Sequence, residues 1–143
     1  MITLLITAVI FIHSLMSASE SAEESSSVLV IFDSVLQFLH LPNLLNGNSI
    51  RKLAHFTEFS VFGFFLSWTV HAYRDKFRGS IFMILFFLLA VPVTDETLQY
   101  FSIGRSAEVK DVLIDFSGAL TGFLILAALC AIAAKKQKKT EIQ

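Results

Sequence analysis

The chain is poor in cysteine and in charge. Its single cysteine, Cys130, lies in an apolar run and can form neither an internal disulfide nor, alone, a thiolate metal site. Charged residues make up 16% of the 143 residues and hydrophobic residues 55%, including 15 phenylalanines. Soluble domains usually carry about 25% charged residues. The composition therefore excludes an ordinary soluble domain and predicts one small integral membrane bundle.

The sequence also lacks a basic groove and a basic N-terminus. Its Lys and Arg residues form short clusters beside apolar segments, without interleaved aromatic residues, so we expect no nucleic-acid partner. The first apolar segment has no Lys or Arg before it, although the small residues Ser17-Ala18-Ser19 would suit a signal peptidase. Signal peptides begin with positive charge. We therefore expect an uncleaved first helix.

Four segments are long and apolar enough to cross a bilayer. A membrane helix needs about 20 apolar residues, rising about 1.5 Å each, to cross about 30 Å of hydrocarbon. The segments are residues 1–17, 53–72, 81–100 and 112–134. We predict an all-α fold, a polytopic membrane bundle of four transmembrane helices. Residues 1–134 would form the membrane domain and residues 135–143 a basic cytoplasmic tail.

The segment between the first two spans is predicted to form an amphipathic helix outside the hydrocarbon. It opens with residues 19–24, a serine- and glutamate-rich run that is too polar to enter the bilayer. An apolar stripe at helical spacing follows, made of Val28, Ile31, Phe32, Val35, Leu36 and Leu39. The helix should end near Pro42, before the turn-prone Asn46-Gly47-Asn48. It would lie in the outer interface or pack over the outer mouth of the bundle.

The distribution of positive charge predicts the orientation, because cytoplasmic loops collect Lys and Arg. Seven of the eleven basic residues flank the spans on one side: Arg74, Lys76, Arg78, Lys135, Lys136, Lys138 and Lys139. We assign this side to the cytoplasm, together with both chain termini. The other four are Arg51, Lys52, Arg105 and Lys110, which fall on the outer side beside unusual polar residues.

Those polar residues lie inside or at the outer ends of the apolar spans, and a charge at the centre of a membrane helix costs about 2.5–3.5 kcal/mol. Such residues are functional candidates because unpaired charges are rare at this depth. The candidate catalytic residues are His55, Glu58, Asp95 and Asp115. The candidate ligand-binding residues are Arg51, Lys52, Glu96, Gln99, Arg105 and Asp111.

Helical spacing predicts which candidates of the second span share a face. Arg51, His55 and Glu58 lie four and three positions apart, so a cation, an imidazole and a carboxylate follow one another into the membrane. The other histidines, His13, His40 and His71, have no carboxylate at matching helical spacing, and we expect structural or interfacial roles for them.

In the third span, Asp95 and Gln99 share a face, whereas Glu96 points about 100° away and should serve a different contact. Pro92 lies three positions before Asp95 and cannot donate its backbone nitrogen, so it can kink the helix and help open an outer cavity.

In the fourth span, Asp111 and Asp115 lie on one stripe with Gly118 and Gly122. The glycine pair allows close approach of a neighbouring helix. Asp111 suits a helix cap, but Asp115 lies a full turn too deep for one. Arg105, in the loop before this span, could pair with a carboxylate of the cluster or bind an anionic headgroup through two hydrogen bonds.

The same residues form an ordered set of short motifs: Arg51-Lys52-x-x-His55-Phe56-x-Glu58-Phe59, Asp95-Glu96-x-x-Gln99, Gly104-Arg105 and Asp111-x-x-x-Asp115-x-x-Gly118-x-x-x-Gly122. In order and spacing the chain resembles the VanZ-like family, small bacterial membrane proteins named for a member associated with resistance to the glycopeptide teicoplanin. Ile10-Phe11 running into Ser14 is also similar to that family's opening pattern.

The resemblance covers nearly the whole chain. Phe59 and Ile103 stand where the family often has Tyr and Pro, and neither difference removes an ionisable group. The resemblance implies a multi-pass protein of the bacterial cytoplasmic (inner) membrane, but it supplies no known reaction.

The residues leave several functions open. In the first hypothesis, an outward-facing polar pocket binds or handles an anionic, amphiphilic envelope molecule. A lipid-linked precursor, a membrane lipid or a lipoglycopeptide would suit, the last in line with the family's link to antibiotic resistance. In the second, the protein is an enzyme acting on a lipid-linked substrate. Its carboxylates and His55 would hold Mg²⁺ or Mn²⁺, or act as general acid and base.

Two further hypotheses are a structural bundle whose charges only hold the helices together and a proton-coupled transporter. The sequence leaves the ligand, the cofactor and the oligomeric state unassigned.

Overall fold

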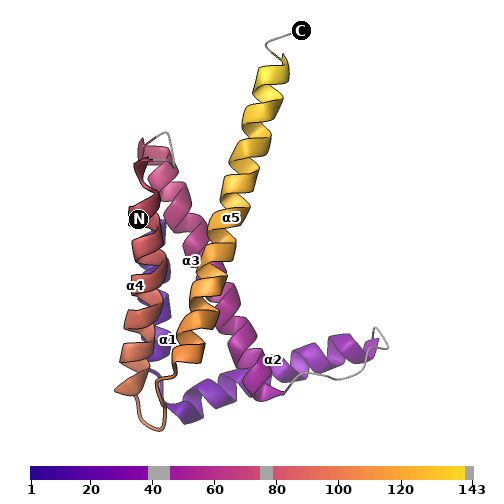
Figure 1. Ribbon diagram of the computed structural model, residues 1–143. Coiled ribbons are helices and arrows are strands. Elements are labelled where there is room, and N and C mark those ends of the chain that lie inside the picture. The colour runs from indigo at the N-terminus through magenta and orange to yellow at the C-terminus, as the bar shows by residue number, and fades with distance from the viewer. Residues whose placement is uncertain (39–45, 75–78, 141–143) are drawn as a thin grey trace.

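The computed structural model describes residues 1–38, 46–74 and 79–140, and within these ranges it contains helices and no strand. The helices are α1 (Ile2–Ser14), α2 (Ala18–Phe38), α3 (Gly47–Arg74), α4 (Ile81–Tyr100) and α5 (Val109–Thr140) (Figure 1). The predicted all-α fold is confirmed.

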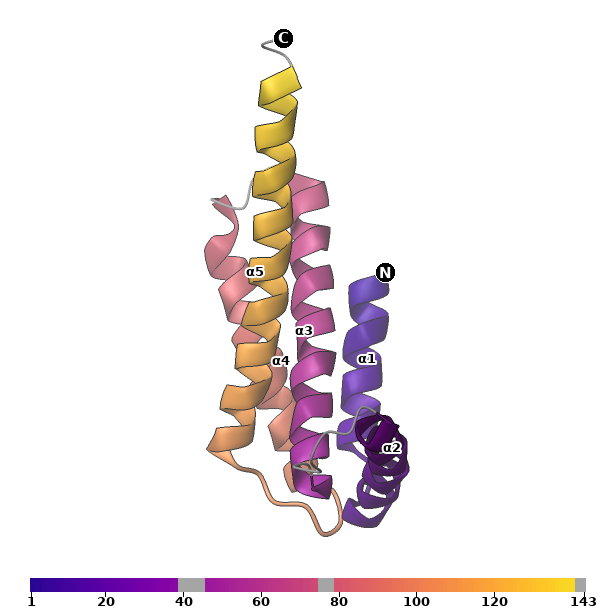
Figure 2. The same cartoon turned by 90° about the vertical axis from the view of Figure 1, so that its right-hand side faces the viewer.

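Helices α1, α3, α4 and α5 run alongside one another, and α2 lies across one end of them (Figures 1 and 2). The chain turns by 114° between α1 and α2. The C-terminal part of α5 projects beyond the other helices at the opposite end (Figure 2). The predicted basic tail therefore continues the last helix as far as Thr140.

Two helices are long and apolar enough to cross a membrane, over Ile81–Tyr100 and Val109–Lys138, and α1 joined to the start of α2 would make a third. The predicted count of four spans is not confirmed. With 13 residues, α1 alone is only about 20 Å long, short of the roughly 30 Å hydrocarbon core. Helix α3 is long enough, but His, Glu, Ser and Thr residues interrupt its apolar sequence.

Helix α3 begins at Gly47, earlier than the predicted start of the second span at residue 53. Its first turn is capped by Asn46, whose Oδ1 accepts hydrogen bonds from the Ser49 backbone N–H at 2.9 Å and from the Ser49 hydroxyl at 3.0 Å. Asparagine is a favoured N-cap residue because it satisfies an amide that has no partner within the helix. The predicted turn is thus the start of the helix.

Helix α2 begins at Ala18 and includes the serine- and glutamate-rich run of residues 19–24. Ser17 and Glu20 form a capping box: the Ser17 backbone N–H donates to Glu20 Oε2 at 2.8 Å, and the Glu20 N–H donates to Ser17 Oγ at 3.4 Å. The predicted end near Pro42 and the stripe residue Leu39 lie outside the described residues. Helix α2 lies at one end of the bundle and projects to one side of it (Figures 1 and 2), and its predicted place at the outer interface is not confirmed.

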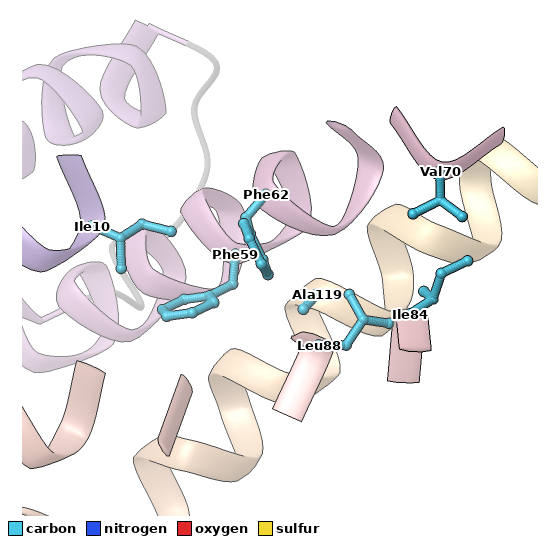
Figure 3. Packing of buried hydrophobic residues seen from close by; sticks show 7 residues of the cluster. All are labelled: Ile10, Phe59, Phe62, Val70, Ile84, Leu88 and Ala119. Carbon is cyan, nitrogen blue, oxygen red and sulfur yellow. The ribbon is translucent and has the colours of Figure 1, made fainter. Parts of the chain in front are cut away.

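The closest helix contact joins α3 and α5. Backbone carbonyls of Phe56 and Ser60 lie against Gly118 and Gly122, and a Cβ atom at either glycine would overlap them. The predicted close approach at the glycine stripe is confirmed. Gly63 of α3 makes the reciprocal contact with the α5 backbone at Ala119. The core beside this contact contains Ile10, Phe59, Phe62, Val70, Ile84, Leu88 and Ala119 (Figure 3).

Candidate functional site

The polar candidates gather at the end of the bundle where α2 lies. The N-terminal half of α3, the C-terminal end of α4, the loop after α4 and the first turns of α5 supply them. Helix α4 runs through the buried Pro92 without interruption and carries its polar residues to that end. Residues far apart in the sequence therefore share one site.

Its centre consists of His55, Asp95 and Asp115, one from each of α3, α4 and α5. His55 Nδ1 lies 3.6 Å from Asp115 Oδ1. One donor atom from each of the three residues lies within 4.8 Å of the others. Asp95 is 0% and Asp115 1% exposed, so the two carboxylates are removed from solvent. We name these three residues the central cluster.

A chain of hydrogen bonds links the central cluster to the loop after α4. The Ser14 hydroxyl donates to Asp95 Oδ1, and Gln99 Nε2 donates to Asp95 Oδ2 at 2.8 Å. Gln99 Oε1 accepts a hydrogen bond of 2.8 Å from Arg105 Nη2. The predicted common face of Asp95 and Gln99 is thus one hydrogen-bonded unit.

Arg105 binds neutral acceptors directly. Its Nη1 donates to the His13 carbonyl at 3.2 Å, in addition to the bond with Gln99. Burial lowers the pKa of its guanidinium, with repulsion by Arg51 as the second cause. Arginine nevertheless stays charged in proteins. Its buried Nε has no hydrogen-bond partner among the described residues.

Glu58 lies outside the central cluster and pairs with His13. Its Oε1 is 3.2 Å from His13 Nδ1. Spacing within one helix did not identify this carboxylate partner of His13, because the pair joins α1 to α3. Ser14 was another missed partner of the site, for the same reason. His40 lies outside the described residues.

The remaining acidic candidates have separate contacts. Asp111 Oδ1 lies 3.3 Å from Lys52 Nζ, which joins the start of α5 to α3. Glu96 Oε1 accepts the Glu108 backbone N–H at 2.6 Å. Glu96 therefore holds the segment leading into α5, in agreement with its predicted direction away from Asp95.

Two cavities adjoin the central cluster. The larger, of about 170 Å³, is lined by His13, Ser21, Glu24, Val28, Ile50, Arg51, Ala54, His55, Glu58 and Arg105. We name it the arginine cavity. The smaller, of about 10 Å³, is lined by Arg51, Lys52, His55, Gln99, Asp111, Ile114 and Asp115. Arg51 and His55 line both. All ten predicted site residues except Asp95 and Glu96 border one of the two cavities.

This geometry suits recognition of an anion beside a half-buried imidazole and two buried carboxylates. Arginine forks match phosphate and carboxylate oxygens, and the central cluster offers donor atoms that a divalent cation accepts.

No curated protein and no solved structure matches the chain at a significant level. The model of one protein family, described as VanZ/LLP1, matches residues 1–131, which is most of the 143-residue chain. Together with the two helices that are apolar enough to cross a membrane, this match makes the chain a membrane protein belonging to the VanZ/LLP1 family.

Proposed function

We propose that this protein binds an anionic, amphiphilic molecule of the bacterial cell envelope, with the headgroup in the arginine cavity. The observation that carries the proposal is that Arg51 and Arg105, which come from α3 and from the loop after α4, line the same cavity. Two guanidinium groups on one cavity favour an anion with several oxygens, such as a phosphate ester.

The two arginines retain unused hydrogen-bonding capacity. No carboxylate whose side chain the structure describes lies within ion-pairing distance of Arg51. Arg105 is held by Gln99, yet its Nε is without a hydrogen-bond partner among the described residues. A bound anion would supply acceptors to both arginines, because a guanidinium group binds two acceptor oxygens at once.

The size and lining of the cavity favour an amphiphile. A volume of about 170 Å³ is below the 300–1,000 Å³ or so typical of pockets for drug-sized ligands, so it suits a headgroup rather than a whole lipid. Val28, Ile50 and Ala54 supply apolar lining. The acyl or prenyl part of the ligand would then remain against the apolar helix surfaces.

The proposed orientation places this site at the outer face of the inner membrane, with both chain termini in the cytoplasm. The start of α1, the end of α3 and the C-terminal lysines of α5 share one end of the bundle, opposite α2 and the site (Figure 1). The positive-inside rule favours the cytoplasm for the lysine-bearing end. In this arrangement α1, α3, α4 and α5 form the membrane bundle and α2 lies at the outer interface.

The proposal is tested by native mass spectrometry of the purified protein in EDTA, with equal amounts of a polyprenyl phosphate and phosphatidylcholine. The polyprenyl phosphate should bind preferentially, and Arg51→Glu should weaken its binding at least about tenfold, or about 1.4 kcal/mol. Lys110→Glu is the matched control, since Lys110 is an exposed cation that lines neither cavity. Equal binding of the two lipids, or equal losses in the two variants, would refute the proposal.

The link to glycopeptide resistance is tested with the same complex. Teicoplanin should displace the polyprenyl phosphate from the native protein if a lipoglycopeptide uses the arginine cavity. If the lipid stays bound at saturating teicoplanin, the arginine cavity does not bind this lipoglycopeptide.

A second candidate function is catalysis on the same class of molecule, and the central cluster favours it. An imidazole and two buried carboxylates from three helices could supply acid–base chemistry or hold a metal beside the headgroup. The purified protein should then release a product from a lipid-linked precursor, and Asp115→Asn should stop release while the lipid still binds. If no product forms with any divalent metal tried, catalysis is excluded and binding is the remaining function.

A further inference from the structure

The carboxylate of Asp115 is the least satisfied polar group of the site. It is 1% exposed, and neither of its oxygens has a hydrogen-bond partner among the described residues. Its nearest basic atom, His55 Nδ1, is 3.6 Å away, beyond hydrogen-bonding distance. Burying an ionised carboxylate without compensation costs several kcal/mol. The group lies buried beside His55, and a cation held between the two residues would compensate its charge.

No lysine or arginine side chain that the structure describes forms an ion pair with Asp115. Lys52 pairs with Asp111, and Arg105 donates to Gln99 and to the His13 carbonyl. Arg51 lines both cavities but forms no ion pair with Asp115. The protein's own charges therefore leave Asp115 uncompensated within the described part of the chain.

We infer that His55, Asp95 and Asp115 bind a divalent transition-metal ion, with Mn²⁺ and Zn²⁺ as the best-suited metals. Their donor atoms lie within 4.8 Å of one another. Two ligands of one Zn²⁺ ion, each at about 2.0–2.2 Å from it, lie at most about 4.4 Å apart, so the cluster needs only a small contraction. The two aspartates balance the charge of the ion.

The donor set decides the class of metal. One imidazole nitrogen with two carboxylate oxygens suits Mn²⁺ or Zn²⁺, whereas Ca²⁺ and Mg²⁺ prefer oxygen ligands throughout. The single cysteine, Cys130, does not belong to the cluster, which makes the thiolate-preferring Cu⁺ a poor candidate.

The surroundings of Asp95 have the form of a second coordination shell. Ser14 and Gln99 each donate to one of its oxygens, and Arg105 in turn holds Gln99. A carboxylate oxygen has two lone pairs, so each can accept its hydrogen bond and still bind a metal. Such partners orient ligands and commonly contribute 10- to 100-fold in metal affinity.

Room for a further ligand exists beside Asp115. The cavity of about 10 Å³ lined by His55, Gln99 and Asp115 has space for about one water molecule. Three protein ligands and one open position are typical of metal sites that act on a bound molecule. Arg51 connects this position with the arginine cavity, so an anionic oxygen could reach the metal. This last step rests on the proposed function, whereas metal binding itself does not.

The test measures Mn²⁺ binding to the EDTA-treated, dialysed protein by electron paramagnetic resonance, without lipid. The native protein should remove the signal of free Mn²⁺ in a saturable titration that Zn²⁺ reverses. Asp95→Asn and Asp115→Asn should each weaken binding at least about tenfold. Glu108→Gln is the control, because it removes an exposed carboxylate near the site. Unchanged Mn²⁺ affinity in both aspartate variants, or no binding by the native protein, would overturn the inference.

Thermal unfolding distinguishes loss of the site from loss of the fold. In EDTA, Asp115→Asn should be at least as stable as the native protein, because it removes a buried charge that lacks a hydrogen-bond partner. With Mn²⁺ added, only the native protein should gain stability, by ligand linkage. An equal Mn²⁺-dependent gain in both proteins would count against the site. Because lipid binding is measured in EDTA, a failure of the metal site leaves that result independent.

Discussion

Gln99 holds together the loop and the buried centre of the site. Its amide donates to Asp95 and accepts from Arg105, both at 2.8 Å. A side-chain amide can donate and accept at once, whereas an aliphatic side chain of similar size can do neither. Its loss would leave a buried carboxylate and a half-buried guanidinium each short of one partner.

Gln99→Leu should therefore lower the free energy of unfolding by about 1–3 kcal/mol, the cost of leaving buried polar groups unsatisfied. Unfolding of the purified protein by SDS, followed by circular dichroism, measures this change. Tyr100→Phe, at the exposed next position of α4, should change stability by less than about 0.5 kcal/mol. Equal stability of the two variants would contradict the bridging role.

The pair of His13 and Glu58 is the residue-scale contact that joins α1 to α3 at the arginine cavity. His13 is 47% and Glu58 24% exposed at the side chain, so solvent weakens the interaction. A double-mutant cycle with His13→Gln and Glu58→Gln should give a coupling energy of up to about 1 kcal/mol. The same cycle between His13→Gln and Lys110→Gln should give no coupling energy. A coupling energy of zero for His13 and Glu58 as well would show that their contact does not stabilise the protein.

At the scale of elements, the contact of α3 with α5 sets the distance between His55 and Asp115. The glycines of α5 allow the α3 backbone to come so close that a methyl group would not fit at Gly122. Phe56 follows His55 in α3, and its carbonyl contacts Gly118 of α5, three positions after Asp115. The packing stripe and the polar site are therefore consecutive parts of one helix interface.

Gly122→Ala should destabilise the protein by about 1–3 kcal/mol through overpacking, although alanine favours a helix by about 1 kcal/mol relative to glycine. The matched control is Gly47→Ala, where an added Cβ would meet no atom within 4 Å. SDS unfolding measures both variants. If Gly122→Ala raised stability as much as helix propensity alone predicts, the close contact would be disproved.

For the whole molecule, the decisive question is which end of the bundle faces outward. Helix α2, the start of α3 and the loop after α4 share one end, and the C-terminal part of α5 lies at the other (Figure 2). The first end carries residues of the arginine cavity, and the second carries the lysines of α5. Because translocating several lysines across the membrane is unfavourable, the lysine end should remain in the cytoplasm.

Cysteine labelling of intact cells checks this orientation. In a Cys130→Ser background, Glu24→Cys at the cavity rim should react with a membrane-impermeant maleimide, and Lys138→Cys should react only after the cells are opened. Both positions are exposed, so different reactivity reports sidedness rather than burial. The reverse labelling pattern would place the arginine cavity in the cytoplasm and exclude an outer-leaflet ligand.

The sequence by itself determined the all-α fold, the membrane class, the family and most of the candidate site residues. Composition and helical periodicity carry this information, since apolar length predicts a membrane helix and polar interruptions within it stand out. The spacing of Gly118 and Gly122 in α5 likewise predicted a close helix contact. The start of α3 was harder to predict from the sequence, because its first turn is polar and depends on the Asn46 cap.

Only the tertiary structure decided which residues touch. It paired Glu58 with His13 and gave Asp95 its hydrogen bond from Ser14, contacts between helices far apart in the chain that spacing within one helix does not encode. It also brought His55 and Asp95 to Asp115, whose carboxylate has no hydrogen-bond partner in the described part of the chain. The physical reason is that packing at the α3–α5 glycines fixes the approach of whole helices, and this distance, rather than local sequence, sets the geometry of the site.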